Sequence, residues 1–83
     1  MEQNLDEKKA MRRIKLERAI EEMRYASSRT MAVKNDEKIY CGELKRYVGT
    51  VARVQEIFRE YSTNDPIPTD LLERYDGILE PRD

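Results

Sequence analysis

The sequence contains no histidine and a single cysteine, Cys41, among its 83 residues. One cysteine cannot form an internal disulfide, and without histidine a zinc site of the Cys/His type has no ligand set. Histidine is also the most common general base at neutral pH, and most metal-free nucleophile sites need one. We therefore expect no enzymatic activity, no metal and no cofactor. Cys41 is expected to be partly or fully buried at the edge of the core of the second helix and to have no catalytic role.

Long apolar runs are absent as well. No uncharged stretch approaches the roughly 18 to 20 residues of a membrane span, and the opening sequence MEQNLDEKK has no apolar signal-peptide region. A lone free thiol suits a reducing compartment. We expect a protein of the cytosol or nucleus that does not enter a membrane, and we assign it to the cytoplasm.

A chain of 83 residues is long enough for one domain at most. A domain of this size buries only about 60% of the surface of its unfolded form, so its core alone gives a small margin of stability. Small folds compensate with disulfides, a structural metal or association with another chain. The first two lack their residues here, so oligomerisation or docking on a partner remains.

Glycine and proline are also missing between residues 5 and 33, where strong helix formers dominate. The pattern predicts a first helix over about residues 5–33. Asn35 or Asp36 suits the N-cap of a second helix over about 36–61. Its apolar positions follow a regular heptad spacing: Tyr40, Leu44, Tyr47, Val51, Val54, Phe58 and Tyr61.

Residues 62–83 follow the predicted hairpin of residues 1–61 as a separate tail. Pro66 and Pro68 disfavour helix at the residues before them. Thr69 resembles the N-cap of a short helix over Asp70 to Tyr75, closed by Gly77. The predicted fold class is all-α: an antiparallel, coiled-coil-like two-helix hairpin with a short C-terminal helix.

The apolar arc of the second helix spans roughly 200° of the helical wheel, which is more than one partner helix covers. A second copy of the chain would cover the rest in an antiparallel four-helix bundle. We therefore expect a homodimer whose interface includes Tyr47, Val51, Val54 and Phe58. The alternative is a monomer in which the tail folds back over the same surface.

Two glycines, Gly42 and Gly49, lie seven residues apart on the polar side of the second helix. Each costs up to ~1 kcal/mol relative to alanine. Either another backbone approaches closely beside Ala52, or the helix simply tolerates them.

The first helix carries a second apolar line, nearly opposite its core stripe, formed by Met11, Ile14 and Tyr25 with Arg18 between them. An antiparallel hairpin does not need this line, and Met and Tyr suit partner surfaces. The leading hypothesis is a small regulatory or adaptor protein that binds one protein partner through these four residues. The competing interpretations are the dimer seam and scattered surface residues.

Nucleic-acid binding is the alternative function. The first helix is rich in basic residues that could lie along phosphates: Lys8, Lys9, Arg12, Arg13 and Lys15. On the helical wheel these charges surround the helix instead of forming one patch, which is typical of a solvated surface. The formal net charge of −1 also counts against this alternative.

Overall fold

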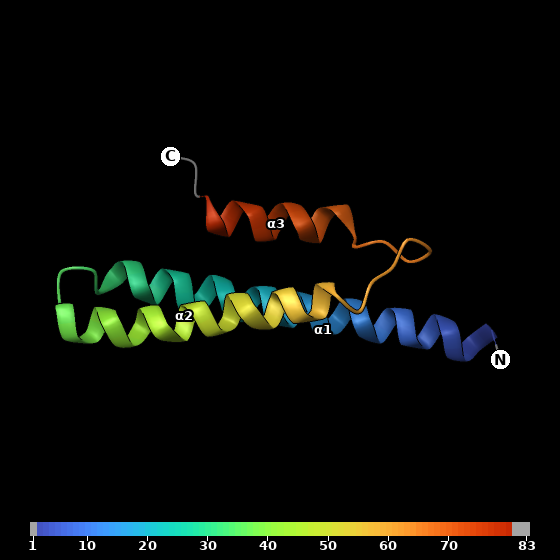
Figure 1. Cartoon of the computed structure of the whole chain (residues 1–83), viewed down its shortest axis with the longest axis horizontal. Helices are drawn as coiled ribbons and strands as arrows, with labels where there is room; N and C mark the ends of the chain where they lie inside the picture. Colours follow the sequence, from blue (N-terminus) through green and yellow to red (C-terminus); the bar gives the residue numbers. More distant parts are fainter. Residues whose placement is uncertain (1, 81–83) are drawn as a thin grey trace.

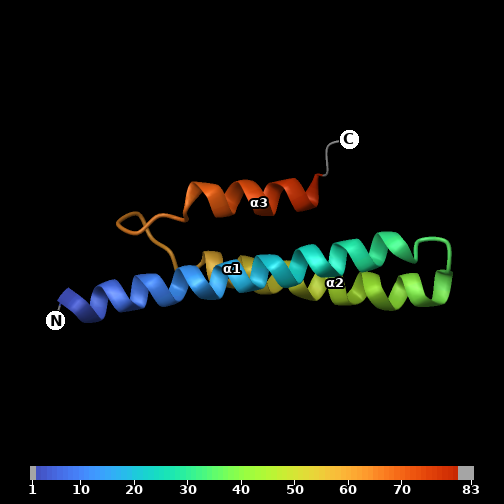
Figure 2. The same cartoon turned by 180° about the vertical axis from the view of Figure 1, so that it is seen from behind.

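The computed structural model describes residues 2–80, with side chains from residue 6 onward. Within that range it contains three helices, α1 (Glu2–Ala32), α2 (Glu37–Phe58) and α3 (Thr69–Leu79). α1 and α2 form an antiparallel hairpin, and α3 lies along one side of it (Figure 1). Seen from behind, the first turns of α1 extend beyond the end of α2 (Figure 2). The chain is therefore all-α with a helical hairpin, as predicted.

Local sequence determines where α2 begins. The Asp36 carboxylate accepts a hydrogen bond from the Ile39 backbone N–H at 3.3 Å, which makes Asp36 the N-cap. α2 ends at Phe58, three residues earlier than predicted. The Tyr61 N–H bonds to the Phe58 carbonyl, a tighter i to i−3 pattern that closes the helix before the tail begins.

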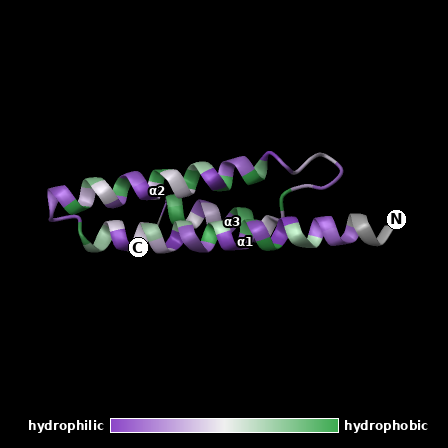
Figure 3. Ribbon diagram, turned by 90° about the horizontal axis from the view of Figure 1, so that it is seen from below, coloured by the Kyte–Doolittle hydropathy of each residue, from purple (hydrophilic) through white to green (hydrophobic). Residues whose placement is uncertain are grey.

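The core lies where the three helices meet. Hydrophobic residues recur along α1 and α2 among hydrophilic ones (Figure 3), and those turned inward are buried. Full burial of a side chain as large as Leu, Ile, Met or Val contributes about 1.5–3 kcal/mol. The buried cluster consists of Leu16, Ala19, Ile20 and Met23 of α1, Val54 and Ile57 of α2, and Leu71 and Tyr75 of α3.

α3 is longer than the predicted helix over Asp70 to Tyr75. Pro68 is its N-cap, and Thr69 is its first residue. Gly77 lies inside the helix and does not close it, because Ile78 beyond it packs against the core. Burial of Ile78 favours continuing the helix past the glycine.

The tail folds back over the hairpin through α3. Leu71 is fully buried, and the Tyr75 ring meets the Phe58 ring edge-on at a centroid distance of 4.9 Å. The Gln55 side-chain amide donates a hydrogen bond to the Tyr75 hydroxyl at 3.0 Å. The close backbone approaches of α3 are to α1, so α3 reaches α2 through long side chains. α3 thus covers part of the wide apolar arc of α2 within one chain.

Ion pairs connect the tail to α1. Arg13 Nη2 lies 2.7 Å from Asp70 Oδ2 at the start of α3. This hydrogen bond holds the pKa of Asp70 below its ordinary value of 3.8. Arg12 pairs with Asp65 in the connecting segment, and its guanidinium lies 5.4 Å from the centre of the Tyr61 ring. The Arg13–Asp70 pair is exposed and adds little stability, and the Arg12–Asp65 pair is part-buried; together they connect the tail to α1 at two points.

One prediction about α2 is wrong: Cys41 is exposed. It lies on the side of α2 that neither α1 nor α3 covers, where Val48 is exposed too. A Cβ added at Gly42 or Gly49 would meet nothing within 4 Å, so within residues 2–80 no other segment approaches either glycine closely.

Candidate protein-binding surface on α1

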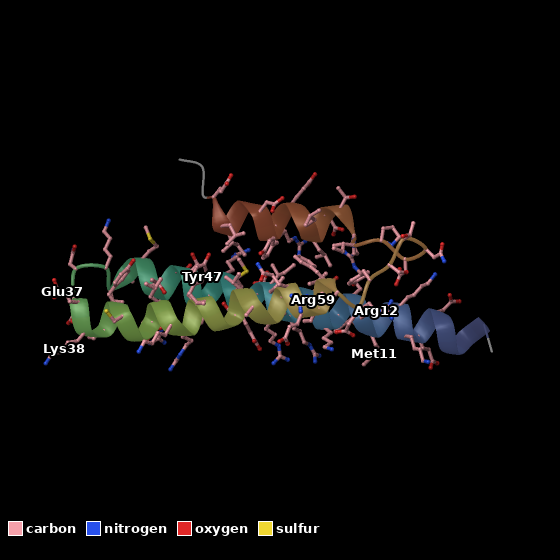
Figure 4. The ribbon with its side chains drawn as sticks, viewed as in Figure 1. Met11, Arg12, Glu37, Lys38, Tyr47 and Arg59 are labelled. Carbon is pink, nitrogen blue, oxygen red and sulfur yellow. The ribbon has the colours of Figure 1, made fainter. Side chains whose placement is uncertain are left out.

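A groove of about 780 Å³ lies between α1 and the second half of α2. Met11, Ile14 and Arg18, three of the four residues predicted to bind a protein, line it. Met11 projects from α1 on the side opposite α3 (Figure 4). α3 therefore leaves this groove open. Arg53 of α2 and Glu60, which follows the end of α2, also line the groove, and the sequence pattern had indicated neither residue.

The apolar side chains of this surface are largely solvent-exposed. Met11 has 64% of its surface exposed and Tyr25 has 65%, and Ile14 is exposed as well. Ala19, which is buried, also lines the groove, together with Met11 and Ile14. Single exposed apolar residues are ordinary, but three on one side of a helix next to a groove are typical of an interaction surface.

Tyr25 lies on the same side of α1 but does not line the groove. The Arg29 guanidinium lies 5.7 Å from the centre of its ring and donates a hydrogen bond to its hydroxyl at 3.3 Å. Arg29 also lies 3.4 Å from a Glu43 carboxylate oxygen of α2. These contacts hold the ring of Tyr25 against the end of the hairpin, where its free face meets solvent.

The groove has a mixed but mainly positive lining. Lys15 Nζ of α1 and Glu60 Oε2 of the segment after α2 lie 2.8 Å apart across it. Arg18 and Arg53 make no ion pair with any described residue. The charged residues of the lining are the cations Lys8, Arg12, Lys15, Arg18 and Arg53 and the carboxylates Glu7, Glu22 and Glu60.

The cations predicted to contact nucleic acid divide into two groups. Arg13 pairs with a carboxylate of α3, and Arg12 and Lys15 each pair with a carboxylate of the segment between α2 and α3. Lys8 and Lys9 form no ion pair with a described residue. The five therefore do not form one continuous cationic strip.

The residues predicted for the dimer interface already pack inside the single chain. Val54 is fully buried, and Phe58 contacts Tyr75 of α3. Tyr47 and Val51 are half-buried against the same core, and burial raises the pKa of Tyr47. The exposed apolar residues near them are instead Leu44 and Val48 of α2 and Leu72 and Leu79 of α3.

The fold thus defines a small all-α protein, a helical hairpin with a third helix docked along it and an open groove on its other side. None of its helices within residues 2–80 is long and apolar enough to cross a membrane. Comparison of the chain with protein-family models, with curated proteins and with solved structures found no match.

Proposed function

We propose that this protein is a non-enzymatic regulatory or adaptor module that binds one protein partner in the groove between α1 and α2. The observation that carries the proposal is the exposure of Met11, Ile14 and Tyr25 on one side of α1, around Arg18. Such residues combine adaptable and amphipathic contact area, which is typical of partner surfaces.

The occupant that fits this groove is an amphipathic helix with acidic residues beside its apolar face. The lining runs from Glu7 to Glu22 along α1, and at ~1.5 Å per residue this span accommodates about four turns of a partner helix. Five cations and three carboxylates surround the apolar floor, so carboxylates on the partner would meet Arg18 and Arg53. These charges would steer association and reject wrong partners more than they would add affinity.

Capture of partners from the native cell, followed by mass spectrometry, tests this function. The variant carries Met11→Ser, Ile14→Ser and Tyr25→Ala and should lose the partner that the wild type retains. A matched control carries Met31→Ser and Ile39→Ser, which alter similarly exposed residues away from the groove. The proposal fails if the triple variant remains folded, keeps its oligomeric state and still retains every partner.

The second part of the proposal is self-association, with α2 at the centre of the dimer. α3 covers part of the apolar arc of α2, but exposed apolar residues remain on α2 and on α3. A monomeric mass at tens of micromolar, with a thermal transition independent of concentration, would remove this part.

Nucleic-acid binding is the weaker alternative, because Arg12, Arg13 and Lys15 already pair with carboxylates of the same chain. A nucleic-acid protein would show an affinity that falls steeply with salt. Absence of binding to duplex or single-stranded nucleic acid at ~50 mM salt would exclude it.

A further inference from the structure

One edge of α2 and the adjoining edge of α3 form a continuous side of the molecule, here named the α2–α3 face. Its exposed apolar residues are Leu44 and Val48 of α2 and Leu72 and Leu79 of α3. Each pair is spaced four or seven residues apart and so lies on one side of its helix.

The contact between Tyr75 and Gln55 shows that these edges are neighbours. Leu72 and Leu79 lie three residues before and four residues after Tyr75, so they share the side of α3 that adjoins α2. Val48 lies seven residues before Gln55, so it shares the side of α2 that adjoins α3. The four exposed residues therefore belong to one surface, and this surface does not include the groove on the other side of α1.

Charges of opposite sign border the two halves of this face. Three cations, Lys38, Lys45 and Arg59, and two carboxylates, Glu37 and Glu56, lie along this edge of α2, with Arg59 at its C-terminal end (Figure 4). The outer edge of α3 carries only carboxylates among its charged residues: Glu73, Asp76 and Glu80. The α2 half is thus mainly positive, and the α3 half is negative.

A two-fold axis that lies in the plane of the face, parallel to the helices, would place α2 of each copy over α3 of the other. The apolar residues of the α2 half would then meet those of the partner's α3 half, and the basic edge would meet the acidic edge twice. We propose that the homodimer forms through the α2–α3 face, so that α2 and α3 of both copies make its four-helix centre. This inference rests on the self-association proposed above and adds the face that mediates it.

The face is large enough for a modest dimer. At ~1.5 Å per residue, α2 and α3 are about 33 and 16 Å long, and helices pack roughly 10 Å apart. Their side-by-side projection is roughly 500 Å², below the ~800 Å² per partner of a typical stable interface, and the relief of the side chains adds to the area that would be buried. In this dimer the groove beside Met11 stays accessible, because Met11 projects opposite α3 (Figure 4).

Analytical ultracentrifugation of the full chain tests the face, at concentrations from about 1 to 500 µM that cover weak to moderate association. The variant carries Val48→Asp and Leu79→Asp. Each substitution occurs twice in a symmetric dimer, so we expect the dimer dissociation constant to rise at least about 100-fold. The control carries Met31→Asp and Ile39→Asp, at residues comparably exposed on other sides, and should dimerise like the wild type.

A charge exchange tests the arrangement within the face. Lys45→Glu with Arg59→Glu, or Asp76→Lys with Glu80→Lys, should each weaken the dimer about tenfold at low salt. Combining all four substitutions should restore association, because the α2 edge, now acidic, would again lie against an edge of opposite charge, the α3 edge of the partner, now basic.

The outcomes separate the two proposals. A wild type that stays monomeric throughout the range overturns both the self-association and the face. A dimer that the apolar and charge variants leave unchanged overturns the face alone. Failure of the combined charge variant to restore association, after each edge variant has weakened it, overturns the placement of α2 over the partner's α3.

Discussion

Replacement of Leu71 by alanine should release α3 from the hairpin while α1 and α2 stay helical. Leu71 is fully buried in the cluster that joins α3 to α1 and α2. Leu→Ala at such sites costs about 2–5 kcal/mol, which includes the cavity left behind. A loss of about 3 kcal/mol shifts the ratio of docked to detached α3 by roughly 100-fold, since each 1.4 kcal/mol is a factor of ten.

Amide hydrogen exchange measures this effect segment by segment. In the Leu71→Ala variant the amides of α3 should exchange much faster than in the wild type, whereas the inner amides of α1 and α2 should keep most of their protection. Circular dichroism should show that the hairpin remains helical.

Leu72→Ala is the matched control, because it makes the same chemical change one residue later, at an exposed position. It should cost less than about 1 kcal/mol when measured at a concentration too low for self-association. Equal acceleration of α3 exchange in both variants would show that burial of Leu71 does not hold the helix, and so would full protection of α3 in Leu71→Ala.

Four further outcomes follow from the same contacts. Tyr75→Phe should lower the free energy of unfolding by about 1 kcal/mol in chemical denaturation, because the Tyr75 hydroxyl accepts a hydrogen bond from Gln55 of α2. Tyr61→Phe is the control and should leave the free energy of unfolding unchanged, because the buried Tyr61 hydroxyl has no partner among the described residues. The hydrogen bond from Arg13 lowers the pKa of Asp70, so the stabilisation by this ion pair is complete above the ordinary value of 3.8 and is lost as the pH falls below it. The protection factors of the α3 amides, which correct for the intrinsic slowing of exchange in acid, should therefore fall between about pH 4 and pH 2, and Asp70→Asn should remove this pH dependence. Gly49→Ala should raise the thermal midpoint and stabilise the fold by about 0.5–1 kcal/mol, because its new Cβ meets open space; a destabilised variant would indicate a close neighbour at that site. The exposed thiol of Cys41 should react with a thiol reagent in the folded protein nearly as fast as in the denatured chain, and strong protection at low concentration would contradict its placement.

The elements that local chemistry controls could be predicted from the sequence. Asp36 caps α2 because a short carboxylate can reach a free N–H of the first turn, which is a property of neighbouring residues alone. Periodicity likewise predicts that Val54 of α2 faces inward, and Val54 is buried.

Features that depend on packing between distant segments could not be read in the same way. Gly77 resembled a helix C-cap, but the burial of Ile78 extends α3 past it. The width of the apolar arc on α2 showed that one helix cannot cover it, yet periodicity does not say whether the tail or another chain does. For the same reason Cys41 was placed in the core, although α3 leaves its side of α2 uncovered.

The candidate surface on α1 was predicted in part. Met11, Ile14 and Arg18 could be grouped because they lie on one side of one helix. The contribution of Arg53 and Glu60 depends on how α2 lies against α1, and no pattern within either helix specifies that register. The ion pairs of Arg12 and Arg13 with the tail were also beyond the sequence, because their partners follow a segment whose path is not periodic.

Arg12 pairs with Asp65, which lies 53 positions further along the chain, and Arg13 pairs with Asp70, which lies 57 positions further along. These long separations affect the order in which the protein folds. A hairpin of α1 and α2 closes through a short turn and can form while the rest of the chain is still being synthesised, whereas α3 needs a long loop to close. We therefore expect docking of α3 to be the last folding step. Until then the apolar side of the nascent hairpin stays open, and that interval is when a chaperone or a second newly made copy has access to it.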